Sequence, residues 1–265
     1  MPAWRNRRRR ALPVNSLIPN ILTVLALCAG MTSIRFALQE RWDLAVFAVV
    51  VAAVFDGLDG RMARLLKGAT KFGAELDSLS DFIAFGVAPG VIVYLWSTNE
   101  LGGIGWMAAL AYGTCCALRL ARFNTALEQE HDVPVWSKYF FTGVAAPAGA
   151  GFALLPVVLS HVFGDTVFRA PLLSAIWLIV VAFLMISRLP TYSFKLLRVR
   201  RDFVLPTLVL VGFAAAILVS YPWITLGTLG LAYLGSIPFS VMRHRRLVAN
   251  AKAAHEVQPA DKSVE

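Results

Sequence analysis

The chain has 265 residues, of which 58% are hydrophobic and only 15% are charged. This composition argues against a water-soluble globular domain and favours a protein embedded in a membrane. The net charge of +9 is explained by membrane topology and attraction to anionic lipids, so nucleic-acid binding is not required.

Apolar stretches near the length of about 20 residues that crosses a bilayer recur along the chain. They predict an all-α fold, a polytopic membrane bundle of about eight transmembrane helices. The predicted spans cover 17–34, 42–60, 79–98, 103–123, 141–161, 171–187, 203–220 and 222–241. The first stretch follows Arg7 to Arg10 and could instead be a signal peptide, but it is long and no clear small-residue cleavage site follows it.

The basic residues give an independent test of these spans and an orientation. If the N-terminus is cytoplasmic, the predicted cytoplasmic segments hold all but three of the 25 lysines and arginines, the exceptions being Arg35, Arg41 and Arg169. This bias follows the positive-inside rule. We therefore expect a basic cytoplasmic arm at 1–16, a membrane domain at 17–242 and a polar cytoplasmic tail at 243–265 that is disordered at its end.

Four aspartates break the rule that membrane helices avoid charge. Asp56 and Asp59 end one apolar stretch, and Asp77 and Asp81 open the next. An aspartate at the centre of a membrane helix costs about 2.5–3.5 kcal/mol, so such residues are candidates for function. Residues three or four apart share a helix face. A hairpin of the two helices would therefore bring the four carboxylates together near the cytoplasmic surface.

Such a cluster requires a neutralising partner. Mg²⁺ and Mn²⁺ prefer oxygen ligands, and Mg²⁺ commonly shares its coordination sphere with substrate phosphates. Zinc is disfavoured because no His or Cys lies among these residues, and calcium storage is disfavoured because the spacing does not match an EF-hand loop. The alternative without a metal is that the aspartates are helix caps and turn formers, as a single Asp-Gly often is.

The residues between the aspartates suit a phosphate-bearing ligand. Gly57, Gly60, Ala63 and Gly73 leave space for its close approach. Arg64 carries a planar guanidinium that could bind phosphate oxygens. Alternatively, Arg64 is an ordinary cytoplasmic positive charge.

The acidic region matches a known signature, D-x2-D-G-x2-A-R-x8-G-x3-D-x3-D, and by it the chain resembles the CDP-alcohol phosphatidyltransferase family. The matching residues are Asp56, Asp59, Gly60, Ala63, Arg64, Gly73, Asp77 and Asp81. Within the family the chain is most similar to the bacterial phosphatidylserine synthases, on the segments SLIPNILT (16–23), DSLSDFIAFGVAP (77–89), LRLARFN (118–124) and YSFK (192–195). The resemblance implies a six-helix core extended by two helices.

The resemblance also implies an activity, which is transfer of a phosphatidyl group from CDP-diacylglycerol to the hydroxyl of L-serine with release of CMP. The alternative is the same transfer to another alcohol, such as glycerol 3-phosphate, choline or inositol phosphate. A homodimer in the bacterial inner membrane is implied, with its active site on the cytoplasmic side. Two divalent ions, Mg²⁺ or Mn²⁺, would be held by Asp56, Asp59, Asp77 and Asp81. Asp81 would also be the catalytic base.

The resemblance assigns binding of the CDP-lipid to Gly60, Ala63, Arg64 and Gly73. For the acceptor or a phosphate, the candidates are Arg119, Arg122 and Asn124 at the cytoplasmic end of the fourth predicted span, and Lys195 after the sixth. Topology and snorkelling explain the same positive charges equally well. A transporter is a separate interpretation, but the acids gather in one hairpin at one membrane face, whereas a transporter would carry charges near mid-membrane in several spans.

Overall fold

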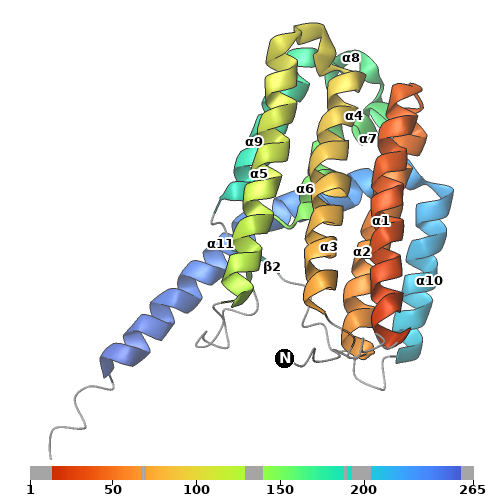
Figure 1. The fold of residues 1–265 in the computed structure, drawn as a ribbon. Coiled ribbons are helices and arrows are strands. Elements are labelled where there is room, and N and C mark those ends of the chain that lie inside the picture. Colours follow the sequence, from red (N-terminus) through yellow and green to blue (C-terminus); the bar gives the residue numbers. More distant parts are fainter. Residues whose placement is uncertain are drawn as a thin grey trace, which may run out of the picture.

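The structure is a computed structural model, and it describes residues 14–66, 68, 70–128, 140–187, 190–192 and 204–257. Figure 1 shows most of the helices running side by side, as expected for a bundle that crosses a membrane. Among the described residues, five helical segments are long and apolar enough to cross a bilayer, and Pro171–Ile186 is a shorter apolar helix. The chain is therefore a polytopic helical membrane protein, as its sequence predicted.

Each predicted span contains a helix, but the fifth, 141–161, begins in a short strand and is divided into two helices at Leu154. The N-terminal half contains α1 (Val14–Leu38), α2 (Trp42–Leu65), α3 (Lys71–Asp81), the π-helical turn η1 (Phe82–Val87), α4 (Ala88–Trp96), the 3₁₀ turn η2 (Thr98–Leu101) and α5 (Gly103–Glu128). The C-terminal half contains α6 (Ala146–Ala153), α7 (Leu155–Phe163), α8 (Asp165–Phe168), α9 (Pro171–Ile186), α10 (Val204–Ser220) and α11 (Pro222–Val257). Two short strands, β1 (Phe140–Thr142) and β2 (Pro190–Tyr192), pair antiparallel.

The helix that carries Asp77 and Asp81 begins earlier than its apolar stretch. It starts at Lys71 and continues through η1 and α4 to Trp96, whereas the sequence predicted a span from residue 79. Thr70 caps this helix, because its backbone is extended and its side-chain oxygen accepts a hydrogen bond from the Gly73 amide at 3.0 Å. The two aspartates therefore lie inside a continuous helix, which fixes the direction of their side chains.

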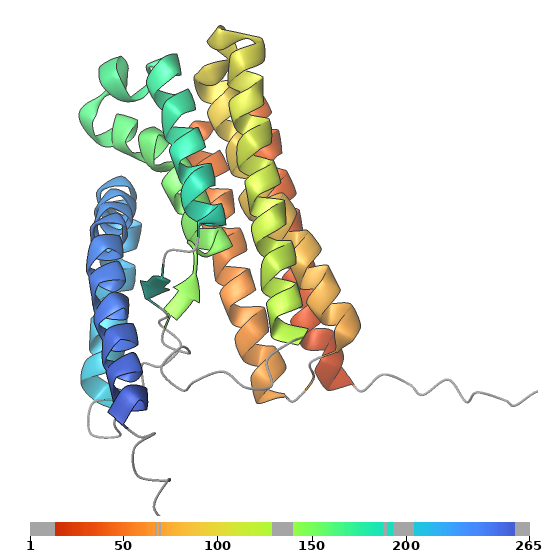
Figure 2. The ribbon, with the colours of Figure 1, turned by 90° about the vertical axis from the view of Figure 1, so that its left-hand side faces the viewer.

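The last two helices pack as a pair against one side of the bundle. Figure 2 shows α10 and α11 as a pair beside the bundle. Aromatic pairs join α11 to α6 and α7: Phe152 stacks on Tyr233 with ring centroids 5.5 Å apart, and His161 stacks on Trp223 at 4.1 Å. The helix α11 continues to Val257, beyond the boundary at residue 242 that the sequence predicted for the membrane domain.

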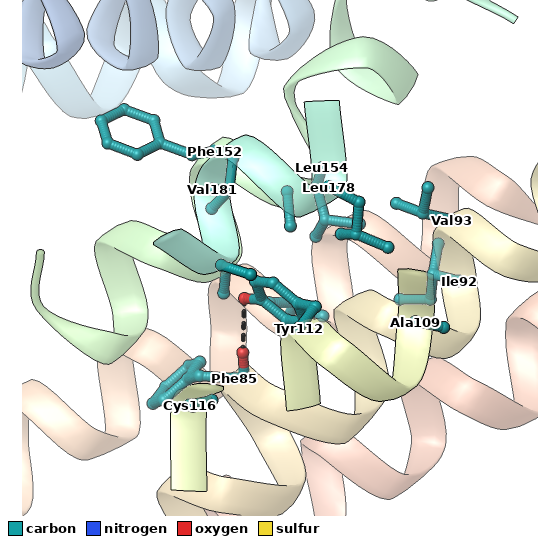
Figure 3. Packing of buried hydrophobic residues seen from close by; sticks show 14 of the residues in the cluster. Phe85, Ile92, Val93, Ala109, Tyr112, Cys116, Phe152, Leu154, Leu178 and Val181 are labelled. Carbon is teal, nitrogen blue, oxygen red and sulfur yellow. Dashed lines mark hydrogen bonds between the residues drawn. The ribbon is translucent and has the colours of Figure 1, made fainter. Parts of the chain in front are cut away.

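A buried apolar cluster packs η1, α4 and α5 against α6 and α9 (Figure 3). Tyr112, on α5, is fully buried and donates a hydrogen bond to the Phe85 carbonyl in η1 at 2.7 Å. Close packing explains Gly86, since a Cβ there would lie 3.1 Å from the sulfur of Cys116. This core holds η1, and therefore the residue before it, Asp81, in a defined place.

Candidate active site

Three of the four predicted acidic residues converge between α2 and α3. One carboxylate oxygen from each of Asp56, Asp59 and Asp77 lies within 4.8 Å of the others. Oxygens that bind one hard divalent cation at about 2.0–2.6 Å lie at most about 4–5 Å apart. The triad therefore fits one such cation with little rearrangement. Like charges this close repel each other strongly, so neutralisation by a cation also explains how the triad is tolerated.

Asp81 lies next to this triad but outside the group of oxygens that converge. It is the last residue of α3 and directly precedes the π-helical turn. Its carboxylate is within electrostatic reach of Asp56, Asp77 and Arg119. The roles of Asp81 as a metal ligand and as a base stay predictions.

The helix α1 supplies a hydroxyl to the site that the sequence did not single out. Thr23 donates from Oγ1 to Oδ2 of Asp59 at 2.6 Å, and the two residues are only 3% and 4% exposed. The backbone carbonyl of Thr23 in turn accepts a hydrogen bond from Ser80 of α3 at 3.1 Å. Thr23 therefore connects α1 to both helices that carry the acids.

A cavity of about 180 Å³ opens beside the triad between α1, α2 and α3. It is lined by Pro19, Asn20, Thr23, Asp59, Gly60, Ala63, Gly68, Thr70, Gly73, Ala74 and Asp77. Three of the residues predicted to bind the CDP-lipid, Gly60, Ala63 and Gly73, are thus beside two of the acids. The site is a pocket with an acidic wall.

Gly60 and Gly73, which both line this cavity, differ in the space that an added side chain would find. A Cβ at Gly60 would meet none of the described atoms within 4 Å, so Gly60 borders open space that a ligand can use. A Cβ at Gly73 would lie 2.7 Å from Oδ1 of Asn20, so Gly73 is also needed for the close packing of α3 on α1.

Arg64 does not line this cavity. Its side chain is exposed and its Nε donates to the Gly60 carbonyl at 2.9 Å. Its role in binding the nucleotide or its phosphates stays a prediction.

The four acceptor candidates are separated by their contacts. Arg122 donates to the carbonyls of Ile186 and Ser187 at 2.8 and 3.2 Å, and so ties α5 to the end of α9. Asn124 donates to the Ser78 hydroxyl of α3 at 2.8 Å. Lys195 lies outside the described residues. Arg119 is only 8% exposed, and its Nε has no hydrogen-bond partner within the described part of the chain.

Arg119 is therefore the candidate best placed to bind a substrate anion. A buried guanidinium nitrogen without a partner pays a large desolvation penalty unless a ligand or water satisfies it. The guanidinium lies 6.0 Å from the centre of the Phe123 ring, and its charge acts on both Asp56 and Asp81. Arg122 and Asn124 have protein partners that account for their orientation.

The residues of this site lie within a region that matches a known protein family. The model of the CDP-alcohol phosphatidyltransferase family matches residues 16–235, which include the triad, the cavity and Arg119. The chain belongs to the CDP-alcohol phosphatidyltransferase family. It is therefore a transferase, and enzymes of this family generally depend on a divalent metal ion, for which the triad supplies fitting ligands.

Several relatives of this phosphatidyltransferase carry the same name, CDP-diacylglycerol–serine O-phosphatidyltransferase. The relative from Mycobacterium leprae is 38% identical over 251 residues, which cover 94% of this chain and 82% of the relative. The relative from Helicobacter pylori is 35% identical over 186 residues, covering 69% of this chain and 76% of the relative. The relative from Methanocaldococcus jannaschii is 32% identical over 181 residues, covering 68% and 76%.

Proposed function

We propose that this phosphatidyltransferase is a phosphatidylserine synthase, which transfers the phosphatidyl group of CDP-diacylglycerol to the hydroxyl of L-serine and releases CMP. The observation that carries the chemistry is the triad of Asp56, Asp59 and Asp77, whose oxygens lie within 4.8 Å of one another beside a cavity. Support for serine as acceptor comes from the relatives named for it in two bacteria and an archaeon.

The reaction exchanges one bond to phosphorus for another. The serine oxygen bonds to the phosphorus of the phosphatidyl group, while the bond from that phosphorus to the bridging pyrophosphate oxygen breaks and CMP leaves with that oxygen. The serine hydroxyl loses its proton in the same process. We assign this proton to the carboxylate of Asp81, since Asp81 lies next to the triad without belonging to its converging oxygens.

The triad would hold Mg²⁺ or Mn²⁺ through Asp56, Asp59 and Asp77, with Asp81 contacting a second ion. The bound ions would neutralise the pyrophosphate oxygens and stabilise the departing CMP. Gly60, Ala63 and Gly73 keep the neighbouring cavity free of bulky side chains, which supports binding of the cytidine and its phosphates there. Arg64 would add a positive charge outside the cavity, next to Gly60, whose carbonyl it contacts.

Arg119 is the residue that we assign to serine's carboxylate or to the lipid phosphate. Its buried and unpartnered Nε supports this assignment, because a charge-assisted hydrogen bond to an anion would satisfy it. A phosphorylated acceptor such as glycerol 3-phosphate or inositol phosphate would require more positive charge at the same place. Choline has no anionic group and would require no positive charge at this place.

The lipid's acyl chains need an apolar place near the triad, and the structure has a suitable cavity. It has a volume of about 260 Å³, lies between α2, α6, α7 and α11, and includes Val46, Val49, Val50 and Ala53 of α2. These residues lead along α2 toward Asp56, one helical turn beyond Ala53. We propose that one acyl chain of the lipid substrate lies in this cavity.

The expected setting of the enzyme is the bacterial inner membrane, with both termini and the active site on the cytoplasmic side. The distribution of lysine and arginine supports this orientation. We further propose a homodimer, and a division into the arm 1–16, the membrane domain 17–242 and the tail 243–265.

An acceptor assay tests the proposed function. Purified protein is incubated with CDP-diacylglycerol, Mn²⁺ or Mg²⁺, and each labelled alcohol in turn, and CMP and labelled lipid are measured together. We expect equal amounts of CMP and phosphatidylserine with serine, and neither when EDTA removes the metal. Product from choline, glycerol 3-phosphate or inositol phosphate, with none from serine, would overturn the assignment of the acceptor.

A further inference from the structure

Thr23 is an uncharged residue of α1, and it is buried where α1, α2 and α3 meet beside the cavity. Its hydroxyl lies 2.6 Å from Oδ2 of Asp59 and 3.1 Å from the Pro19 carbonyl. A hydroxyl has a single hydrogen to donate. A distance of 2.6 Å is typical of a hydrogen bond from a hydroxyl to a carboxylate, whereas 3.1 Å is long for this type of bond. The hydrogen therefore belongs to the bond with Asp59.

The backbone of Thr23 is held from the other side. Ser80 is 2% exposed and donates to the Thr23 carbonyl at 3.1 Å. One turn earlier on α1, Asn20 is in close contact with Gly73 of α3. These contacts leave Thr23 little freedom to move relative to α3, which also carries Asp77. The hydroxyl thus connects a carboxylate of α2 to a fixed point between α1 and α3.

We infer that Thr23 is a positioning residue for the metal site, whose hydroxyl holds one oxygen of Asp59 so that the other oxygen remains available to the cation shared with Asp56 and Asp77. This inference rests on the proposed function, since it requires the divalent cation at the triad. A carboxylate with one oxygen fixed loses less rotational freedom when it binds a metal. Partners that orient metal ligands in this way typically contribute 10–100-fold to metal affinity.

Metal binding measured without substrate tests the inference. The full-length protein is purified in detergent and titrated with Mn²⁺, and free Mn²⁺ is measured by electron paramagnetic resonance. Thr23→Val keeps the shape of the side chain but removes the hydroxyl, and we expect its Mn²⁺ Kd to rise by about 10–100-fold. Thr23→Ser keeps the hydroxyl, and we expect its Kd to stay close to that of the wild type.

A matched control lies on the same helix. Thr32 also forms a 2.6 Å hydrogen bond, but to the Cys28 carbonyl and in an exposed position. Thr32→Val should therefore leave the Mn²⁺ Kd unchanged. The effect of Thr23→Val should also disappear in an Asp59→Asn background, because Thr23 acts through Asp59.

The possible outcomes are distinct. A folded Thr23→Val protein with the wild-type Kd, or a Thr23→Ser protein as weak as Thr23→Val, would overturn the inference. If Thr23→Val does not fold, Thr23→Ala replaces it, and failure of both to fold would assign Thr23 to helix packing instead. If the wild-type protein binds no Mn²⁺, the proposed metal site itself is overturned. A wild-type protein that binds Mn²⁺ but does not use serine would overturn only the proposed acceptor.

Discussion

Tyr112 and Phe85 are joined by a hydrogen bond of 2.7 Å from the tyrosine hydroxyl to the backbone carbonyl (Figure 3). Phe85 belongs to the π-helical turn that begins directly after Asp81. Such turns leave backbone groups poorly paired and often occur at functional sites. The hydroxyl of Tyr112 stabilises the irregular turn from the neighbouring helix, and so supports the position of Asp81.

The first prediction concerns this hydrogen bond. Tyr112→Phe keeps the buried ring but leaves the Phe85 carbonyl without its side-chain donor. We expect the protein to lose about 1–3 kcal/mol of stability, which corresponds to a thermal midpoint lower by about 2–4 °C for each kcal/mol. Thermal unfolding in detergent checks this. Tyr94→Phe is the matched control. It also removes one tyrosine hydroxyl, but it keeps the ring that packs edge-on against Trp106, with ring centroids 5.2 Å apart. Equal midpoints for the Tyr112 and Tyr94 variants would contradict the prediction.

The second prediction separates the proposed base from the metal triad. Asp81→Asn removes the proton acceptor, so we expect kcat to fall by about 10²–10⁴-fold. Binding of CDP-diacylglycerol and of Mn²⁺ to the triad should persist, because Asp56, Asp59 and Asp77 are intact. The measurements are CMP release, lipid binding and Mn²⁺ titration on the same sample. Asp165→Asn, at an exposed ion pair with Arg169, should change none of them. Substantial turnover in Asp81→Asn would remove this residue from the role of base.

The third prediction distinguishes two arginines that lie three residues apart on α5. Arg119→Lys removes the buried Nε that we assign to the substrate anion, and a lost charge-assisted hydrogen bond is worth about 1.5–3 kcal/mol. We therefore expect kcat/KM for serine or for the lipid to fall by about 10–100-fold, with little change in thermal midpoint. Arg122→Lys breaks the contacts with Ile186 and Ser187, so we expect a lower midpoint. If kcat/KM fell further in Arg122→Lys than in Arg119→Lys, the roles assigned to the two arginines would be reversed.

The sequence alone predicted the helical architecture and the convergence of the acids. Span length and the cost of membrane charge are large effects that depend on local composition, and Asp56, Asp59 and Asp77 were confirmed to lie close together. The early start of α3 at Lys71 was missed, because the polar segment before residue 79 has no hydropathy signal. Thr70, three residues before the Gly73 amide that it caps, was a signal that could have revealed it.

The finer roles of individual residues could not be read from the sequence. Thr23 and Asp59 are 36 residues apart, and a threonine in an apolar helix usually bonds to its own backbone. Arg119 and Arg122 share a cytoplasmic helix end and a residue type. Only their depth and partners distinguish them, and these depend on how α5 packs against α3 and α9.

The fourth prediction tests the acyl cavity beside α2. Gly151 lines this cavity, and a Cβ added there would meet none of the described atoms within 4 Å. Gly151→Leu should therefore fold, while its side chain occupies space that we assign to an acyl chain. We expect KM for CDP-diacylglycerol with long acyl chains to rise by up to about 10–100-fold, because a Leu-sized loss of apolar burial costs at most about 1.5–3 kcal/mol. KM for a short-chain analogue should change little, and so should Mn²⁺ binding. Gly235→Leu is the control, since Gly235 on α11 is equally open to a Cβ but does not line the cavity. Identical chain-length profiles for the two variants would show that the acyl chain lies elsewhere.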